Sequence, residues 1–151
     1  YATQSDYADN PTHYRADYYL LEAGAEHGRF GVKAGYEVLA GAGQPNSAFQ
    51  TPLATLHAFE GWADKFLVTP AGGVEDLYIG GSLTLGKLRL DLIHHDFGAE
   101  ASGAGYGREW DASLAWKARG NCELLLKLAD YGADGFATDT SKLWAQVSAT
   151  F

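Results

Sequence analysis

The chain has little of several things that most proteins use. It contains one cysteine, no methionine and four prolines in 151 residues, and no apolar run approaches the length of a membrane-spanning helix. A single cysteine cannot close a disulfide within the chain, and a helical membrane protein is excluded because a spanning helix needs about 20 apolar residues. A membrane β-barrel is not excluded, since its strands need only about 9–11 residues. The missing initial methionine indicates a processed chain or part of a longer one.

Positive charge is also scarce, with 11 Lys and Arg residues against 19 Asp and Glu residues and a net charge of −8. Proteins that bind nucleic acids neutralise phosphates with clustered lysine and arginine, and no such stripe is present. We therefore expect no nucleic-acid partner. Glycine is abundant instead, at 19 residues, and aromatic residues make up 13% of the chain. In a barrel these residues would form the wall and its aromatic girdle.

Polar and apolar residues alternate with a period of two, which is typical of β-strands with two different faces. Phe30, Val32 and Tyr36 share one face of such a strand, and Lys33 and Glu37 share the other. No charged residue falls on the apolar face of the six most regular strands. The pattern predicts an all-β, antiparallel, up-and-down fold. Its eight expected strands cover residues 1–7, 14–26, 30–38, 77–85, 88–93, 109–116, 122–128 and 142–151.

The connections between these strands are short at one end and long at the other. The short ones are residues 27–29, 86–87 and 119–121, and the long ones are residues 8–12, 40–73, 96–105 and 132–139. This layout is typical of outer-membrane barrels, which have short turns on the periplasmic side.

The longest connection, 40–73, is expected to be an extracellular loop with structure of its own. Thr51 can cap a helix and Pro52 suits a first helical turn, so one or two short helices are predicted between Pro52 and Phe66. The bulky apolar side chains of this loop need a surface to pack on. The loop would provide it either by folding into the barrel as a constriction or by packing on the barrel rim as a cap. The expected constriction residues are Leu53, Leu56, His57, Phe59, Trp62 and Phe66.

Alternation alone does not say which face points outward. A soluble eight-stranded barrel that binds an apolar ligand turns its apolar face inward, whereas a membrane barrel turns it toward lipid. Trp110 and Trp116 share a face about 20 Å apart at about 3.3 Å per residue, close to the ~25 Å apolar band of such barrels. Phe30 and Tyr36 repeat this spacing, so these four residues are the predicted aromatic girdle.

Phe151 ends the last strand in phase with its apolar face, and it resembles the C-terminal signal by which outer-membrane barrels are recognised for assembly. These features predict a transmembrane β-barrel in the bacterial outer membrane. Its expected partners are lipid, lipopolysaccharide and, through the C-terminal strand, the barrel-assembly machinery.

Several strings carry a family resemblance, namely residues 4–8, 33–39, 49–57, 61–66 and 136–140. Over essentially its whole length the chain resembles the C-terminal part of the alginate-export-like family of proteobacterial porins. The resemblance implies passive passage of a hydrophilic solute or polysaccharide, without enzymatic activity or cofactor. It also implies a barrel of about twice as many strands, so residues 1–151 would be either one barrel domain or the C-terminal portion of one. The rest of the wall would come from an N-terminal half or from a homo-oligomer.

The polar faces of the strands supply a candidate selectivity filter. Its expected lumen-lining residues are Lys33, Glu37, Arg89, Asp91, Glu109, Asp111, Glu123, Lys127 and Lys142. With Glu22 the count is four cations against six carboxylates, whereas the alginate exporter has an arginine-rich lumen. This departure makes alginate a doubtful solute.

Other clusters favour structural interpretations. His94 and His95 are adjacent in a strand and point to opposite faces, so they cannot chelate a metal together. Three aspartates in a glycine-rich stretch miss the spacing of a calcium loop and indicate a solvated acidic loop, or one that meets lipopolysaccharide through divalent ions: Asp130, Asp134 and Asp139. Glu109 and Asp111 lack a nucleophile with a base at readable spacing, so ion pairing with Arg89 across the wall is expected.

No metal site and no catalytic residue is predicted. Cys122 is interpreted as a small apolar residue of the lipid face. Two alternatives to a channel stay open. One is a soluble eight-stranded barrel that binds an apolar ligand, and the other is a membrane barrel without a pore and with a structural or adhesive role, in which the lumen charges pair completely.

Overall fold

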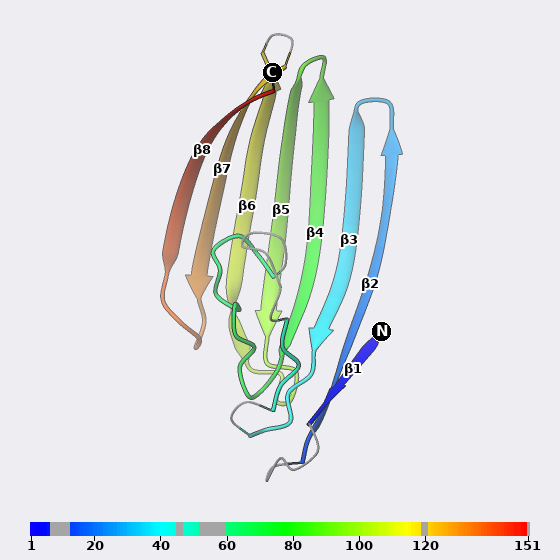
Figure 1. Ribbon diagram of the computed structural model, residues 1–151, viewed down its shortest axis with the longest axis vertical. Coiled ribbons are helices and arrows are strands. Elements are labelled where there is room, and N and C mark those ends of the chain that lie inside the picture. The colour runs from blue at the N-terminus through cyan, green and yellow to red at the C-terminus, as the bar shows by residue number, and fades with distance from the viewer. Residues whose placement is uncertain (7–12, 45–46, 52–59, 119–120, 151) are drawn as a thin grey trace.

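The computed structural model describes residues 1–6, 13–44, 47–51, 60–118 and 121–150. They form one antiparallel sheet of eight strands in which each strand pairs with its neighbours in sequence (Figure 1). The strands are β1 (Ala2–Ser5), β2 (Arg15–His27), β3 (Phe30–Leu39), β4 (Val74–Leu85), β5 (Leu88–Gly98), β6 (Gly105–Lys117), β7 (Cys122–Ala133) and β8 (Thr140–Ala149). The predicted all-β, up-and-down order of eight strands is confirmed. None of the described residues forms a helix that is long and apolar enough to cross a membrane.

The sheet is open, and the predicted closure into a barrel is not seen. Closure requires the first and last strands to pair, but β1 pairs with β2 and β8 pairs with β7. β1 has only four residues, and it lies at the opposite side of the sheet from β8 (Figure 1). Both outer strands therefore have one edge whose backbone groups form no ladder with another described strand.

The ends of the sheet differ as the sequence predicts. The turns at Gly28 and Gly86 connect long strands at one end, and both glycines have a positive φ, 60° and 59°. Such backbone angles suit glycine, which has no Cβ to clash. The long connections, including 40–73, lie at the other end (Figure 1).

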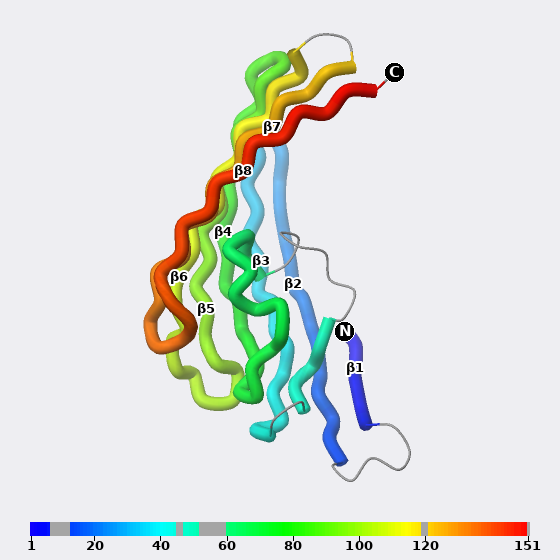
Figure 2. Tube along the Cα trace, turned by 60° about the vertical axis from the view of Figure 1, so that its left-hand side comes forward, coloured from blue at the N-terminus to red at the C-terminus, as the bar shows by residue number. Residues whose placement is uncertain are grey.

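The loop 40–73 returns over the sheet. Figure 2 shows the strands bowed around its second part, residues 60–73. We call the face that this segment covers the inner face and the opposite one the outer face.

The predicted helix in this loop is not seen. Residues 52–59 lie outside the described part of the chain, and residues 60–66 form turns. Glu60, Gly61 and Asp64 have φ angles of 54°, 79° and 58°. Left-handed residues at this spacing interrupt a right-handed helix, although Pro52 and Thr51 suit a helix start.

A small apolar core lies between the loop and the inner face. Phe66 is 2% exposed, and its ring centroid lies 4.7 Å from that of Phe97 and 5.3 Å from that of Phe136. Tyr106 and Tyr131 complete the aromatic cluster. Aromatic pairs at such distances each contribute about 0.5–1.5 kcal/mol beyond their buried area. The cluster therefore anchors the loop to strands β5, β6 and β7.

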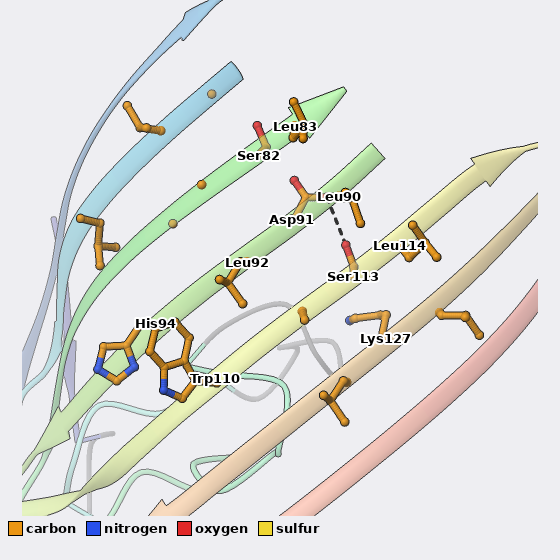
Figure 3. A pocket seen from close by; sticks show the side chains of 18 of the residues that line it. Ser82, Leu83, Leu90, Asp91, Leu92, His94, Trp110, Ser113, Leu114 and Lys127 are labelled. Atoms are coloured by element: carbon orange, nitrogen blue, oxygen red, sulfur yellow. Dashed lines mark hydrogen bonds between the residues drawn. The ribbon is translucent and has the colours of Figure 1, made fainter. Parts of the chain in front are cut away.

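The outer face is apolar and open. Leu21, Ile79 and Leu143 are 74%, 63% and 74% exposed. Leu90, Leu92 and Leu114 line a broad hollow of ≈860 Å³ that is mostly apolar, where the rings of His94 and Trp110 stack 4.4 Å apart (Figure 3). The face that the alternation identifies as apolar is thus the face turned away from the loop.

Candidate functional site

The candidate site is the inner face together with the loop segment that crosses it. Glu109 and Asp111 of β6 are fully buried beneath this segment. The backbone N–H of Ala63 donates to Oε1 of Glu109 at 2.6 Å, and that of Trp62 donates to Oδ2 of Asp111 at 3.1 Å. Hydrogen bonds to charged acceptors contribute about 1.5–3 kcal/mol each. Two neighbouring carboxylates therefore hold the loop backbone in place.

This contact replaces the ion pairing predicted for the two carboxylates, which is wrong. The register places Glu109 opposite His95 and Asp111 opposite Ile93, whereas Arg89 faces Ala115 several residues away. Arg89 instead pairs with Asp91 of its own strand at 2.9 Å. The sequence pattern identifies the shared face correctly but does not determine the register across it.

Two lysines of the inner face also contact the loop. Lys142 Nζ lies 2.8 Å from Oδ2 of Asp64, and both side chains are largely buried. Lys127 Nζ lies 3.8 Å from the ring centroid of Trp62, which is cation–π geometry. Lys65 in the loop donates to Oγ1 of Thr140 at the start of β8. Charged side chains of the sheet and of the loop therefore attach the loop to β6, β7 and β8.

A buried histidine links two aspartates beside this attachment. Nδ1 of His95 is 2.8 Å from Oδ2 of Asp76, and Nε2 is 3.7 Å from Oδ2 of Asp111. The imidazole also stacks on Phe97, with ring centroids 5.4 Å apart. This arrangement joins β4, β5 and β6 under the loop.

Sequence analysis did not select Asp76 or His95 as site residues. The expected strand 77–85 begins just after Asp76, and the expected strand 88–93 ends before His95. Extending the alternation would have found both, since Asp76 is in phase with Tyr78 and His95 is in phase with Asp91.

A second group of polar residues lies on β2, β3 and β4. Lys33 Nζ is 3.6 Å from Oε2 of Glu22, and the Tyr78 hydroxyl donates to the same oxygen at 2.6 Å. The ring of Tyr78 crosses Gly35, where an added Cβ would lie 2.2 Å from the ring. The Tyr18 hydroxyl donates to Oε1 of the buried Glu37 at 2.9 Å.

Glu60 brings a further carboxyl group to this region from the loop. It is 7% exposed. Burial raises its pKa to about 8, and the nearby carboxyl groups of Glu37 and Asp76 act in the same direction. At neutral pH this carboxyl group therefore favours its protonated form.

The remaining predicted residues occupy varied positions. Trp62 and Phe66 lie on the inner face, whereas Leu53, Leu56, His57 and Phe59 fall outside the described residues, as does Phe151. The girdle residues Phe30, Trp110 and Trp116 are exposed on the outer face. There the Tyr36 hydroxyl donates to Glu75 at 2.6 Å. Glu123 lies on the inner face at the short-turn end, opposite Ser148.

The clusters given structural interpretations are also placed. His94 and His95 point to opposite faces, as expected for adjacent strand residues. Asp130 accepts from Ser141, and Asp139 accepts from the Ala133 N–H. Across the described ranges, no three His, Cys, Asp or Glu side chains are grouped closely enough to hold a metal ion. Cys122 is partly exposed and has a free thiol.

Three buried carboxylate oxygens have no hydrogen-bond partner among the described residues, namely Asp76 Oδ1, Glu109 Oε2 and Asp111 Oδ1. An unpartnered buried carboxylate oxygen is costly, so these atoms mark where a proton, water or cation would be most stabilising. The inner face can therefore hold the loop in place, and it presents more carboxyl groups than lysine and arginine side chains to the space beside it. A search of protein-family models, curated proteins and solved structures finds no match to this chain.

Proposed function

We propose that the chain forms part of the wall and the constriction of an outer-membrane channel through which hydrophilic solutes pass passively. The observation that carries the proposal is the division of the sheet into an exposed apolar outer face and a charged inner face crossed by a fastened loop. Lipid would cover the first face and water would fill the space beside the second. The mechanism is steric and electrostatic filtering, without covalent chemistry.

The outer face supports a membrane location. Soluble monomers seldom expose an apolar patch larger than a few hundred Å². Here leucine, isoleucine and valine side chains of six strands stand more than 35% exposed on one face, among them Leu21, Val32, Leu92, Leu126 and Val147. The exposed Trp110 and Trp116 share that face, as interfacial aromatics of a membrane wall do. A soluble barrel with an apolar ligand would need the opposite arrangement.

The loop supports a constriction. Its segment 60–66 crosses β5 to β8 on the inner face and is held by Glu109, Asp111 and Lys142. The expected lumen residues Lys33, Arg89 and Asp91 lie on the same face toward the short-turn end, where a hollow of ≈270 Å³ remains open. A solute that passes along the wall would meet these charges and then the loop.

The open edges support a larger assembly. A sheet cannot enclose a lumen while its outer strands β1 and β8 each pair with only one other strand of the described residues. Strands from a further part of the protein or from a second copy would complete the wall, in line with the family resemblance. The inner face has an excess of carboxylates over lysine and arginine, so a neutral or cationic solute suits it better than alginate.

One observation favours the barrel without a pore as a second candidate. Many inner-face charges are already paired, as in Lys142 with Asp64 and Arg89 with Asp91, and the loop covers one end of the face. In a closed eight-stranded barrel the interior would then be nearly full.

Two measurements test the proposal. The chain is inserted into a planar bilayer, and single-channel currents are recorded after insertion is verified by protease protection in vesicles. Discrete conductance steps are expected, and a silent bilayer with inserted protein would contradict the channel. The intact mass of the native polypeptide from membranes then tells whether further strands come from the same chain or from a second copy.

A further inference from the structure

A small acidic cavity lies on the inner face beneath loop residues 60–62. Its volume is ≈170 Å³, and side chains of β2, β3, β4 and β5 line it together with residues 60–62. Among the described residues that line it, Lys33 is the only lysine and there is no arginine. The carboxyl groups that line it are those of Glu22, Glu37, Glu60 and Asp76.

The contacts of Lys33 show which groups an ammonium group meets at this cavity. Lys33 Nζ lies 3.6 Å from Oε2 of Glu22 and 5.2 Å from the ring centroid of Tyr78. A carboxylate and an aromatic face are the two partners that stabilise organic cations most effectively in proteins. Lys33 and Glu22 are both about half exposed, so this pair marks the open side of the cavity.

The other three carboxyl groups lie at its closed side, without a lysine or arginine. Glu37, Glu60 and Asp76 are 5%, 7% and 1% exposed. Among the described residues, no lysine or arginine forms an ion pair with any of them. Tyr18 and His95 satisfy one oxygen each of Glu37 and Asp76, but Oδ1 of Asp76 has no hydrogen-bond partner. Because buried carboxylates are costly unless paired, the cavity lacks a positive group at this side.

The walls favour an organic cation over a metal ion. The carboxyl groups do not converge on one point, since none of the described acidic and histidine side chains are grouped closely enough for a metal. Trp62, Tyr78 and Ile93 instead provide aromatic and aliphatic surface. An alkylammonium or guanidinium group spreads its hydrogen bonds over several carboxylates and uses such surface for its carbon atoms.

The cavity has an entrance. The hollow of ≈270 Å³ toward the short-turn end shares Lys33, Trp62 and Ile93 with it, so the two spaces adjoin at these residues. A solute that travels along the inner face would reach Glu37 and Asp76 by passing Trp62.

We propose that this cavity binds the ammonium or guanidinium group of a small organic cation, with the charged group among Glu37, Glu60 and Asp76 and the carbon chain against Trp62 and Ile93. This deepens the proposed function by naming the class of solute. It rests on that function only for the claim that the bound cation is transported.

Binding is measured by titration calorimetry on the 151-residue chain folded in nonionic detergent, with three probes of similar size: n-butylammonium, butyramide and butyrate. Saturable binding of n-butylammonium is expected, with affinity about ten-fold or more above that of the other two. Equal binding of all three probes, or no saturable heat with n-butylammonium, would overturn the proposal.

Variants locate the site. Asp76→Asn removes a carboxylate from the cavity, and Glu60→Gln removes the carboxyl group that would ionise when a cation binds. Each is expected to weaken n-butylammonium binding about ten-fold or more. Asp91→Asn is the matched control, since this carboxylate lines the neighbouring hollow, pairs with Arg89 and does not line the cavity. The folded state of each variant is checked by near-ultraviolet circular dichroism. An equal loss in Asp91→Asn would place binding outside the cavity and overturn the proposal.

Proton release gives a readout that does not depend on a variant. In the empty cavity the pKa of Glu60 is raised to about 8 by burial and by the charges of Glu37 and Asp76, while Lys33, Glu22, Tyr78 and His95 are the other charged or titratable groups among the described residues that line it. A bound cation favours the ionised carboxylate, so binding at pH 7 is expected to release protons and to tighten as pH rises from 6 to 9. Calorimetry in buffers of different ionisation enthalpy measures this release. Binding without proton release would exclude Glu60 from the site.

The channel and the cation site can be disproved independently of each other. Conductance without n-butylammonium binding would leave the channel standing and remove the cation site. Cation binding in a chain that inserts but never conducts would leave the site standing and remove the channel.

Discussion

The backbone N–H of Ala63 donates a 2.6 Å hydrogen bond to the fully buried carboxylate of Glu109. This contact joins a residue of the long loop to the middle of the sheet, 46 positions away in sequence. The strand residue thereby determines where the loop crosses the inner face. The first prediction tests this dependence.

Glu109→Ala should loosen the loop, because the N–H of Ala63 loses its acceptor and the Trp62 N–H to Asp111 hydrogen bond then holds the neighbouring backbone without it. A charged hydrogen bond contributes about 1.5–3 kcal/mol, so the loop should open at least about ten-fold more often. Limited trypsin digestion measures this as faster cleavage after Lys65. The control is Glu123→Ala, which removes an inner-face carboxylate near the short turns. Unchanged cleavage in Glu109→Ala would show that the hydrogen bond does not hold the loop.

Gly61→Ala should destabilise the fold more than Gly28→Ala. Both glycines have a positive φ, 79° and 60°, which costs a residue with a Cβ about 1–2 kcal/mol. Only at Gly61 would the Cβ meet another group, since it would lie 2.6 Å from Oε2 of Glu109, whereas nothing lies within 4 Å at Gly28. Chemical denaturation measures the difference. Combining Gly61→Ala with Glu109→Ala should remove the excess cost, and persistence of that excess would point to the backbone rather than the clash.

Phe66→Ala should detach the loop from the aromatic cluster. Its ring packs against Phe97, Tyr106 and Phe136, and removal of a buried phenylalanine costs about 3–5 kcal/mol. The proposed channel should then conduct more current per opening, because the constriction no longer stays on the inner face. Leu67→Ala is the matched control, since Leu67 is next in sequence and 55% exposed. Equal conductance of Phe66→Ala and the unaltered chain would remove the loop as the constriction.

Stability should fall as pH rises through the range in which Glu60 ionises. Its pKa is about 8 in the folded chain against an ordinary value of 4.5, so the folded state holds a proton that the unfolded state releases. The contribution is fully present below pH 4.5 and is lost as pH rises to about 8, on the order of 5 kcal/mol at most. Denaturant unfolding from pH 4 to 9 measures it. Glu60→Gln should flatten the profile over this range, and an unchanged slope would assign it to other groups.

Leu126→Arg should block insertion into lipid vesicles, whereas Gln146→Arg should not. Leu126 is 46% exposed on the outer face, and Gln146 lies on the inner face of the adjacent strand at nearly the same height. An arginine on the lipid face near the bilayer midplane costs about 2–4 kcal/mol, whereas an inner-face arginine contacts water. Vesicle flotation followed by protease protection compares the two. Equal insertion of both variants would contradict a lipid-covered outer face.

The inner-face carboxylates illustrate what sequence reasoning reached and where it stopped. A period of two places Glu109 and Asp111 on one face of their strand whatever the fold around them, because alternate side chains of any strand point the same way. Their partners depend on register, which pairs Glu109 with His95 and leaves Arg89 six residues further along β5. Sliding one strand by two residues keeps the same faces and changes every partner, so the pattern could not exclude the predicted ion pairing.

The conformation of the loop 40–73 also could not be predicted from the sequence pattern. Pro52 and Thr51 are good helix-start residues, but the described segment that follows bends at Glu60, Gly61 and Asp64 to meet acceptors on β6 and a lysine on β8. Contacts between residues more than 40 positions apart outweigh local preference there. Sequence analysis likewise missed Asp76, because its partner His95 is brought near only when β4 pairs with β5.

The strand order, the short and long ends of the sheet and the identity of its apolar face follow from the sequence alone, because alternation and turn residues act locally. Which charges meet, how the loop crosses the inner face and that β1 and β8 do not pair with each other are settled by the three-dimensional structure. These outcomes depend on register and curvature, which arise from the sum of contacts between distant segments. The acidic cavity beneath Trp62 is one such product, since residues of four strands and a loop create it together.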